Sequence, residues 1–223
     1  QRFENRNVLT AIKDKIFKSA SFRLFWGVVM ETKKVIQERR SVHSFDPNKK
    51  VTDAQLKQLF DLVKLSPSGY NLQPWEFIVV RDAANKERLK AVSYNQPHIV
   101  DASAAIIVLG NKLASAHAVN NFDDWARKGY FDQGTADNLK KQMKDLDQRD
   151  ETTKRIWTTR STALAAMTLM IAAKDMGLAT CPMEGFEADK VKKEFSIPEH
   201  YEVVMLIALG YEAKAPLPRV WRR

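Results

Sequence analysis

The chain alternates between short apolar runs and longer segments in which apolar residues recur at helical spacing. Three runs predict strands: EFIVV at 76–80, ASAAIIVLG at 102–110 and VVMLIALG at 203–210. The last two are apolar throughout, which is typical of strands buried on both faces of a sheet. A further extended segment is predicted to begin at Leu178, after Gly177 ends a helix.

Helices are predicted between these strands, over 31–39, 52–63, 82–92 and 152–176. Thr52, with Gln55 three residues later, forms the pattern of a capping box at a helix start. The centre of the long helix, 163–173, is rich in Ala and Met and apolar nearly all round. This pattern predicts a helix that is buried on most of its sides.

Strands separated by helices predict a sheet with helices on both faces and therefore a mixed α and β protein. The sequence contains neither a G-x-G-x-x-G nor a G-x-x-x-x-G-K-[ST] motif. A dinucleotide site of the Rossmann type and a P-loop are therefore not supported.

Two segments stand apart from this alternation. Residues 8–30 mix basic and apolar residues at loosely helical spacing and predict one or two amphipathic helices. We favour packing of this segment on the body of the protein or on a partner subunit, with contact to a membrane surface as the alternative. The polar stretch 111–151, which carries scattered aromatic residues, is interpreted as a set of short helices that cover a site.

Composition further narrows the class of protein and of ligand. With 223 residues and 44% hydrophobic content the chain can bury a sizeable core, and Cys181 as its single cysteine excludes an intrachain disulfide and any multi-cysteine metal site. No apolar run reaches the length needed to cross a bilayer, so we expect a soluble, cytoplasmic protein, although a chain that begins at Gln1 can lack an upstream segment. The formal charge of +9 suits nucleic acid, an anionic membrane or a phosphorylated ligand.

Candidate chemistry is concentrated in three loops. RRSVHSF, at 39–45, places two guanidinium groups and a hydroxyl where a helix ends, a set of donors suited to a phosphate, although an isolated Arg-Arg pair is more often a solvated basic patch. SPSGYNLQPW, at 66–75, offers hydroxyl and amide groups before a strand, yet it also has the composition of an ordinary turn. TCPMEGF, at 180–186, ends a strand in a loop whose backbone can approach a flat ligand.

Together these segments resemble the FMN-dependent nitroreductase family. The resemblance is carried by ERRSVHSFD, SPSGYNLQPWEFIVV, YNQPHIVDASAAIIVLG, LAAMTLMIAAKDMGLATCPMEGF and VVMLIALGY, in this order, and it covers roughly residues 33–223. It implies an α+β fold with a mixed sheet covered by helices on both faces, and an interlocked homodimer with two FMN sites at the subunit interface. The chain is accordingly divided into an N-terminal helical extension, 1–32, and an FMN-binding domain, 33–223.

The resemblance also implies a set of flavin-binding residues. Arg39, Arg40 and Ser41 would contact the phosphate and ribityl end, with His43 at the next basic position of the motif. The loop that lines the flavin, part of which the family often draws from the partner subunit, would supply Pro67, Ser68, Asn71 and Gln73. Asn95 would lie beside the pyrimidine edge, and His98 stands where some members carry a lysine. Pro182, Met183, Glu184 and Gly185 would run over the ring, and Arg219 and Arg222 are the candidates for closing the phosphate site.

The function implied is transfer of hydride from NAD(P)H, through bound FMN, to nitroaromatics, quinones or related acceptors. The cofactor supplies the redox chemistry, so no side chain is assigned as a catalytic acid or base, and the spacing of His, Asp and Glu predicts no metal site. Two alternatives remain: a reductive dehalogenase or flavin-modifying enzyme of the same fold, and a basic binding or membrane-surface module without flavin. Nucleic acid is not expected as a partner, because aromatic and basic residues are not interleaved as a stacking surface requires.

Overall fold

The computed structural model describes residues 31–216 and 218–220, so the amphipathic helices predicted within 8–30 and the candidate Arg222 lie outside the described residues. Four strands form one sheet: β1 Trp75–Val80, β2 Ala104–Asn111, β3 Ala179–Met183 and β4 Tyr201–Gly210. The α-helices of the described chain are α3 Thr32–Glu38, α4 Asp53–Val63, α5 Ala83–Ala91, α6 His98–Asp101, α7 Ala118–Arg127, α8 Gln133–Leu146, α9 Glu151–Asp175 and α10 Ala188–Glu194. Two short 3₁₀ turns, η1 Gly69–Asn71 and η2 Ala114–His117, complete the list.

The strands follow the order β1-β2-β4-β3, and every neighbouring pair is antiparallel. Among the described residues, the parallel contribution is a single bridge between Ser41 and Thr180 at the outer edge of β3. The α+β class and the predicted sheet are confirmed, and the sheet is mixed only through this bridge.

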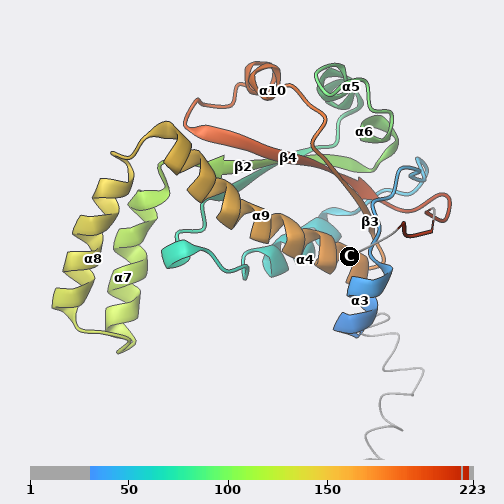
Figure 1. Ribbon diagram of the computed structural model, residues 1–223. Helices are drawn as coiled ribbons and strands as arrows, with labels where there is room; N and C mark the ends of the chain where they lie inside the picture. The colour runs from blue at the N-terminus through green and yellow to red at the C-terminus, as the bar shows by residue number, and fades with distance from the viewer. Residues whose placement is uncertain (1–30, 217, 221–223) are drawn as a thin grey trace, which may run out of the picture.

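Alternation along the strands divides the core into two layers. Ile107, Leu206 and their same-face neighbours pack against α5, α6 and α10. Ile106 and Ile207 point the other way and pack against α4 and α9. Figure 1 shows these helices on opposite sides of the sheet, as successive side chains of a strand require.

The start of α4 and the end of α9 have the capping residues that the sequence predicts. Thr52 accepts a hydrogen bond from the backbone of Gln55, whose side chain in turn accepts one from the backbone of Thr52, so the predicted capping box is confirmed. Gly177 takes a φ of +73° directly after α9, a conformation that favours glycine and ends the helix before β3.

The predicted burial of the centre of α9, residues 163–173, is confirmed for most of its residues, since only Leu164 and Met167 among them are exposed. Together with Ile156, which precedes them in the helix, these two side chains are each more than 40% exposed, although Leu169 and Ala173 on the opposite side are fully buried. An apolar composition indicates burial without saying against what, and one stripe of this helix is left uncovered by the described chain.

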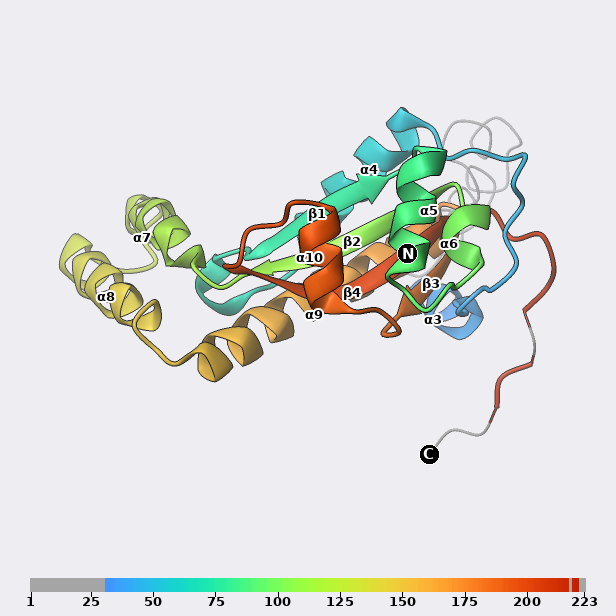
Figure 2. The same cartoon turned by 90° about the horizontal axis from the view of Figure 1, so that it is seen from above.

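The segment 111–151 contains the two antiparallel helices α7 and α8, which project from one end of the sheet as a hairpin (Figures 1 and 2). Phe122, Ala136 and Met143 form a small core between them, separate from the two layers around the sheet. No helix of the described chain has the length and hydropathy needed to cross a membrane.

Candidate functional site

The segment after α3 runs along the outer edge of the sheet. Arg39 leaves the helical conformation with a ψ of 128°, and the N–H of Val42 donates to the carbonyl of Thr180 at 3.0 Å. Val42 and Phe45 are buried in the core, whereas Ser41 and His43 are exposed. The alternation of this short extended segment therefore turns the polar residues of RRSVHSF outward.

These outward residues line a cavity of about 360 Å³, a volume within the range of small-molecule sites. Arg40, Ser41, His43 and Ser44 form one wall, and the tail residues Lys214, Ala215 and Pro216 form the other. The N–H of Ala213 donates to the carbonyl of Ser44 at 2.9 Å and so holds the tail against the segment. Guanidinium, ammonium and hydroxyl groups in one cavity are the donors that a phosphate prefers.

Arg219 ties the tail to the end of α3. Its guanidinium donates to the carbonyls of Gln37 and Arg39, both at 2.7 Å, and to that of Ile36 at 3.2 Å. A cation on the free carbonyls of a helix end is favourable, because those carbonyls carry the negative end of the helix dipole. This clamp holds the backbone beside Arg40, and the sequence held no signal for it.

The YNQPH segment lies against the loop after β3. The side-chain amide of Gln96 donates to the carbonyl of Gly185 at 2.6 Å, and a Cβ at Gly185 would lie 3.0 Å from that amide nitrogen. Tyr94 and Asn95, both exposed, take positive φ values of 51° and 56°. Left-handed backbone at two successive non-glycine residues is uncommon and is found most often at functional sites.

His98 places the YNQPH segment beside RRSVHSF. Its ring centroid lies 5.2 Å from that of His43, and the His98 side chain is buried. Burial lowers the pKa of His98, the nearby His43 lowers it further, and Asp101 opposes both effects. His98 is thus kept neutral more readily than a solvated histidine.

β3 ends at Met183, and Glu184 and Gly185 follow it in the loop. Met183 is 4% exposed, packs in the core and pairs with Leu206 of β4, so this residue does not face outward. Pro182 is half-buried and Glu184 is exposed. Cys181, beside them, is buried, and burial raises the pKa of its thiol to about 11.

The SPSGYNLQ loop lies at the end of the sheet opposite the cavity. It follows α4 and packs near the start of α9, where the N–H of Gly69 lies 3.5 Å from the hydroxyl of Ser161. The hydroxyl of Ser68 accepts from the N–H of Gln73 at 3.0 Å, and Pro67 is exposed. In this loop the positive φ values belong to Tyr70, Asn71 and Gln73 and not to Gly69. Asn121 of α7 donates to the carbonyls of Tyr70 and Asn71.

The separation between this loop and the cavity can be estimated from the strand register. Trp75, just after the loop, pairs with Gly110, which pairs with Glu202 at one end of β4. Ser41 bridges Thr180, which pairs with Leu209 near the other end of β4. Seven residues of strand separate Glu202 from Leu209, or about 23 Å at roughly 3.3 Å per residue. One chain therefore brings RRSVH, YNQPH, PMEG and Arg219 together and leaves SPSGYNLQ at the opposite end of the sheet.

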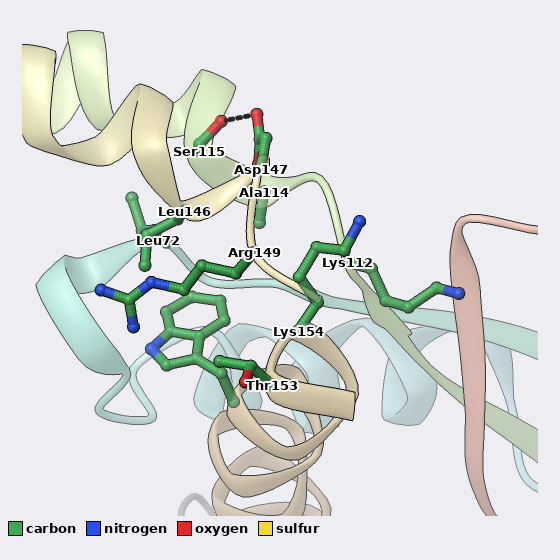
Figure 3. A pocket seen from close by; sticks show the side chains of 10 residues that line it. Leu72, Lys112, Ala114, Ser115, Leu146, Asp147, Arg149, Thr153 and Lys154 are labelled. Carbon is green, nitrogen blue, oxygen red and sulfur yellow. Dashed lines mark hydrogen bonds between the residues drawn. The ribbon is translucent and has the colours of Figure 1, made fainter. Parts of the chain in front are cut away.

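A second hollow lies at the base of the α7–α8 hairpin (Figure 3). Its volume of about 20 Å³ is that of roughly one water molecule. Lys112 and Lys154 beside it are both ion-paired with Glu151, at 2.8 and 2.6 Å. The hollow is too small and its charges too well matched for an organic ligand. In the described part of the chain, no three His, Cys, Asp or Glu side chains gather as a metal site would require.

Residues 36–211 match the model of the nitroreductase family. The chain is 35% identical over 191 residues to "Putative NAD(P)H nitroreductase MhqN" of Bacillus subtilis, which covers 85% of this chain and 93% of that protein.

Solved structures agree with the sequence match. The crystal structure of "putative nitroreductase ydfN" from Bacillus subtilis superposes with a TM-score of 0.80 at 34% identity and covers 86% of this chain and 93% of its own. A structure from Exiguobacterium sibiricum, titled as a "putative nitroreductase in complex with FMN", superposes with a TM-score of 0.78 at 26% identity and covers 87% of this chain and 94% of its own.

Proposed function

The chain belongs to the nitroreductase family, and from this premise we propose that it is an FMN-dependent oxidoreductase that takes hydride from NAD(P)H and reduces nitroaromatics, quinones or related acceptors. The observation that carries the proposal is a cavity of about 360 Å³ lined by RRSVHS and the basic tail, beside which His98 of YNQPH lies against His43 and Gln96 bonds to Gly185 of PMEG. A relative whose title reports bound FMN supports the choice of cofactor.

The residues around the cavity fit this cofactor. Arg40, Ser41 and Lys214, together with Arg39, are suited to the phosphate, since guanidinium and ammonium groups form charge-assisted hydrogen bonds with it. Arg219 would act on the phosphate end by holding the backbone of Arg39 and by its own charge. The exposed amide of Asn95 and the main chain of Pro182 to Gly185 are suited to the edge and face of a flat ring.

We assign the SPSGYNLQ loop to the flavin site of a partner subunit. The loop with Pro67, Ser68, Asn71 and Gln73 directly precedes Trp75, and the register positions of Trp75 and Ser41 on β4 are about 23 Å apart at roughly 3.3 Å per residue. A twofold dimer would place the loop of one chain at the cavity of the other. The exposed apolar side chains Ile156, Leu164 and Met167 of α9 supply a surface that such a dimer would bury.

When bound, the flavin supplies the redox chemistry by accepting hydride and passing electrons on. The chain positions the donor and then the acceptor beside the cofactor, and its positive charge attracts the donor. NAD(P)H carries phosphates, and the net charge of +9 favours its approach. No side chain of the chain is required to break a covalent bond in this scheme.

The test begins with the purified protein. We expect a yellow protein that releases FMN, identified by chromatography, at close to one per chain, and anaerobic bleaching by NADH or NADPH followed by reoxidation with a quinone or nitroaromatic. A protein that stays colourless after incubation with FMN would contradict the proposal.

The phosphate assignment makes the first specific prediction. Arg39→Glu together with Arg40→Glu replaces two cations by two anions beside the phosphate, so FMN affinity should fall by at least about 100-fold, as expected for the loss of two charge-assisted contacts of roughly 1.5 kcal/mol or more each. Fluorescence titration of the FMN-free protein measures this affinity. Lys57→Glu with Lys64→Glu on the exposed face of α4 reverses the same number of charges elsewhere and should leave FMN affinity within about threefold, because exposed charges act weakly at a distance.

A further inference from the structure

Two histidines from separate segments meet behind the wall of the cavity. His43 belongs to the extended segment after α3 and lines the cavity, and His98 is the first residue of α6. Their ring centroids are 5.2 Å apart, with 47° between the ring planes. We call these two residues the histidine pair. Its outer member is exposed to the cavity, and its inner member is 5% exposed.

The inner histidine carries an unsatisfied atom. Nε2 of His98 is buried and has no hydrogen-bond partner among the described residues. Buried polar atoms without a partner are rare, because leaving one unpaired is unfavourable. A neutral imidazole nitrogen in this position remains available for a proton.

Two cations and one carboxylate lie around the histidine pair. His43 and Arg40 stand on the cavity side, Asp101 lies at the end of α6, and Lys86 of α5 donates to the carbonyls of Val100 and Ala102 at 2.7 and 2.8 Å. Burial and the neighbouring His43 lower the pKa of His98, whereas Asp101 raises it. Near neutral pH, a small change in the charge of the cavity is enough to decide whether such a group holds a proton.

We propose that Nε2 of His98 takes up a proton from solvent, with His43 as its link to the cavity, when the bound flavin is reduced, and releases this proton when the flavin is reoxidised. The inference rests on the proposed function and adds a role for this chain's own residues. Hydride brings two electrons and one proton, so the cofactor gains one unit of negative charge. A proton from water on His98 restores the charge balance of the site, and no other reactant is needed.

A positive charge that appears only in the reduced state has a consequence for catalysis. It stabilises the reduced cofactor below the pKa that His98 reaches in that state, and this stabilisation is lost as the pH rises through that value. A lysine has an ordinary pKa of about 10.4, well above that of histidine, so at this position it would carry its charge in both states over more of this pH range than a histidine does.

The experiment measures how many protons the protein takes up when its bound flavin is reduced. FMN-loaded protein in weakly buffered solution is reduced anaerobically with a measured amount of dithionite at several pH values between 6 and 9, and proton uptake is followed with an indicator dye, with protein-free dithionite as the blank. For the wild type we expect a window in this range in which close to one additional proton is taken up per two electrons, relative to His98→Lys and His98→Gln. Nitrogen NMR of histidine-labelled protein should show the His98 ring neutral when oxidised and protonated when reduced.

The matched control is His200→Gln, which removes a histidine beside Tyr201 at the opposite end of the sheet and should leave proton uptake unchanged. Equal uptake by the wild type and both His98 variants would overturn the inference. His98→Lys retains a cation and serves if His98→Gln does not fold. Because every sample must first hold FMN, failure to bind FMN would refute the proposed function, whereas bound FMN with unchanged uptake would refute only the role of His98.

Discussion

Gly110 lies in β2 where the strand passes close to α9, and its missing side chain permits this approach. A Cβ at this position would lie 2.7 Å from the hydroxyl of Thr158 and 3.0 Å from that of Thr162. The hydroxyl of Thr158 is held in place by its hydrogen bond to the carbonyl of Asn111 at 3.1 Å. The contact between helix and strand therefore has no room for one additional methyl group.

Gly110→Ala should lower the free energy of unfolding by about 1–3 kcal/mol, the usual effect of overpacking. Urea unfolding followed by circular dichroism measures the change. Asn138→Ala, at an exposed position of α8, is the control and should be neutral or slightly stabilising, since alanine is favoured in helices. Equal stability of the wild type and Gly110→Ala would show that α9 yields at this contact.

Cys181 supplies a prediction about pH. Burial raises the pKa of its thiol to about 11, so the folded protein retains the proton between about pH 9 and 11 while the unfolded chain releases it. The stability contribution of this thiol therefore falls as the pH rises through that window. A pKa raised by about two units lowers the thiolate fraction roughly 100-fold, and alkylation by iodoacetamide at pH 8.5 should be slower than in urea by at least this factor. Mass spectrometry of timed samples measures both rates, and equal rates would mean that the thiol is accessible.

At the scale of single residues, the sequence predicted which side chains could bind a ligand better than it predicted the conformation of the backbone. The polar residues of RRSVHSF were identifiable because phosphate chemistry demands those donors. The left-handed backbone at Tyr70 and Asn95 was not, since both are non-glycine residues. The Arg219 clamp also depends on contacts between residues about 180 positions apart, which no local pattern encodes.

The capping box is the feature of α4 that is easiest to test. Thr52→Ala removes the acceptor for the N–H of Gln55 and should lower the free energy of unfolding by about 1 kcal/mol. Chemical denaturation measures this loss. Thr152→Ala, in the first turn of α9 but not at its N-cap, changes the same side chain without removing a cap and should cost less than about 0.5 kcal/mol. A loss of equal size in both variants would argue against the cap.

Most elements were predictable because their patterns are continuous. β2 and β4 begin within two residues of the predicted positions, since a strand buried on both faces is apolar throughout. The antiparallel pairing and the strand order were not predictable, because they depend on contacts between distant segments. The exposed side of α9 was missed for a related reason: its apolar residues have the same pattern whether they face their own chain or a second one.

At the scale of the whole molecule, the separation of the two loop sets leads to a test of shared sites. Arg39→Glu/Arg40→Glu damages the cavity side, and Asn71→Gly removes an amide from the distant loop while keeping a φ of 53° that glycine readily adopts. Each variant alone should retain little FMN. In a mixed dimer purified through two different tags, one site carries both defects and the other carries none, so about half of the wild-type FMN content should return, as twofold symmetry requires.

FMN content after gel filtration is the measurement, and light scattering confirms that the mixed species contains two chains. Mixed dimers that hold no more FMN than their parents would mean that each site is built within one chain. Val119→Glu on the exposed surface of α7 combined with the wild type is the control for the tagging procedure and should leave both sites filled.

The hairpin of α7 and α8 has its own small core, built on Phe122, Ala136 and Met143, apart from the layers that stabilise the sheet. Substitutions on its outer faces are therefore expected to accumulate with little penalty to folding. Selection can reshape this appendage over evolutionary time, in length and in surface, while the sheet that carries the cavity stays the same. Within one family, members with a common scaffold are free to diverge first in this hairpin.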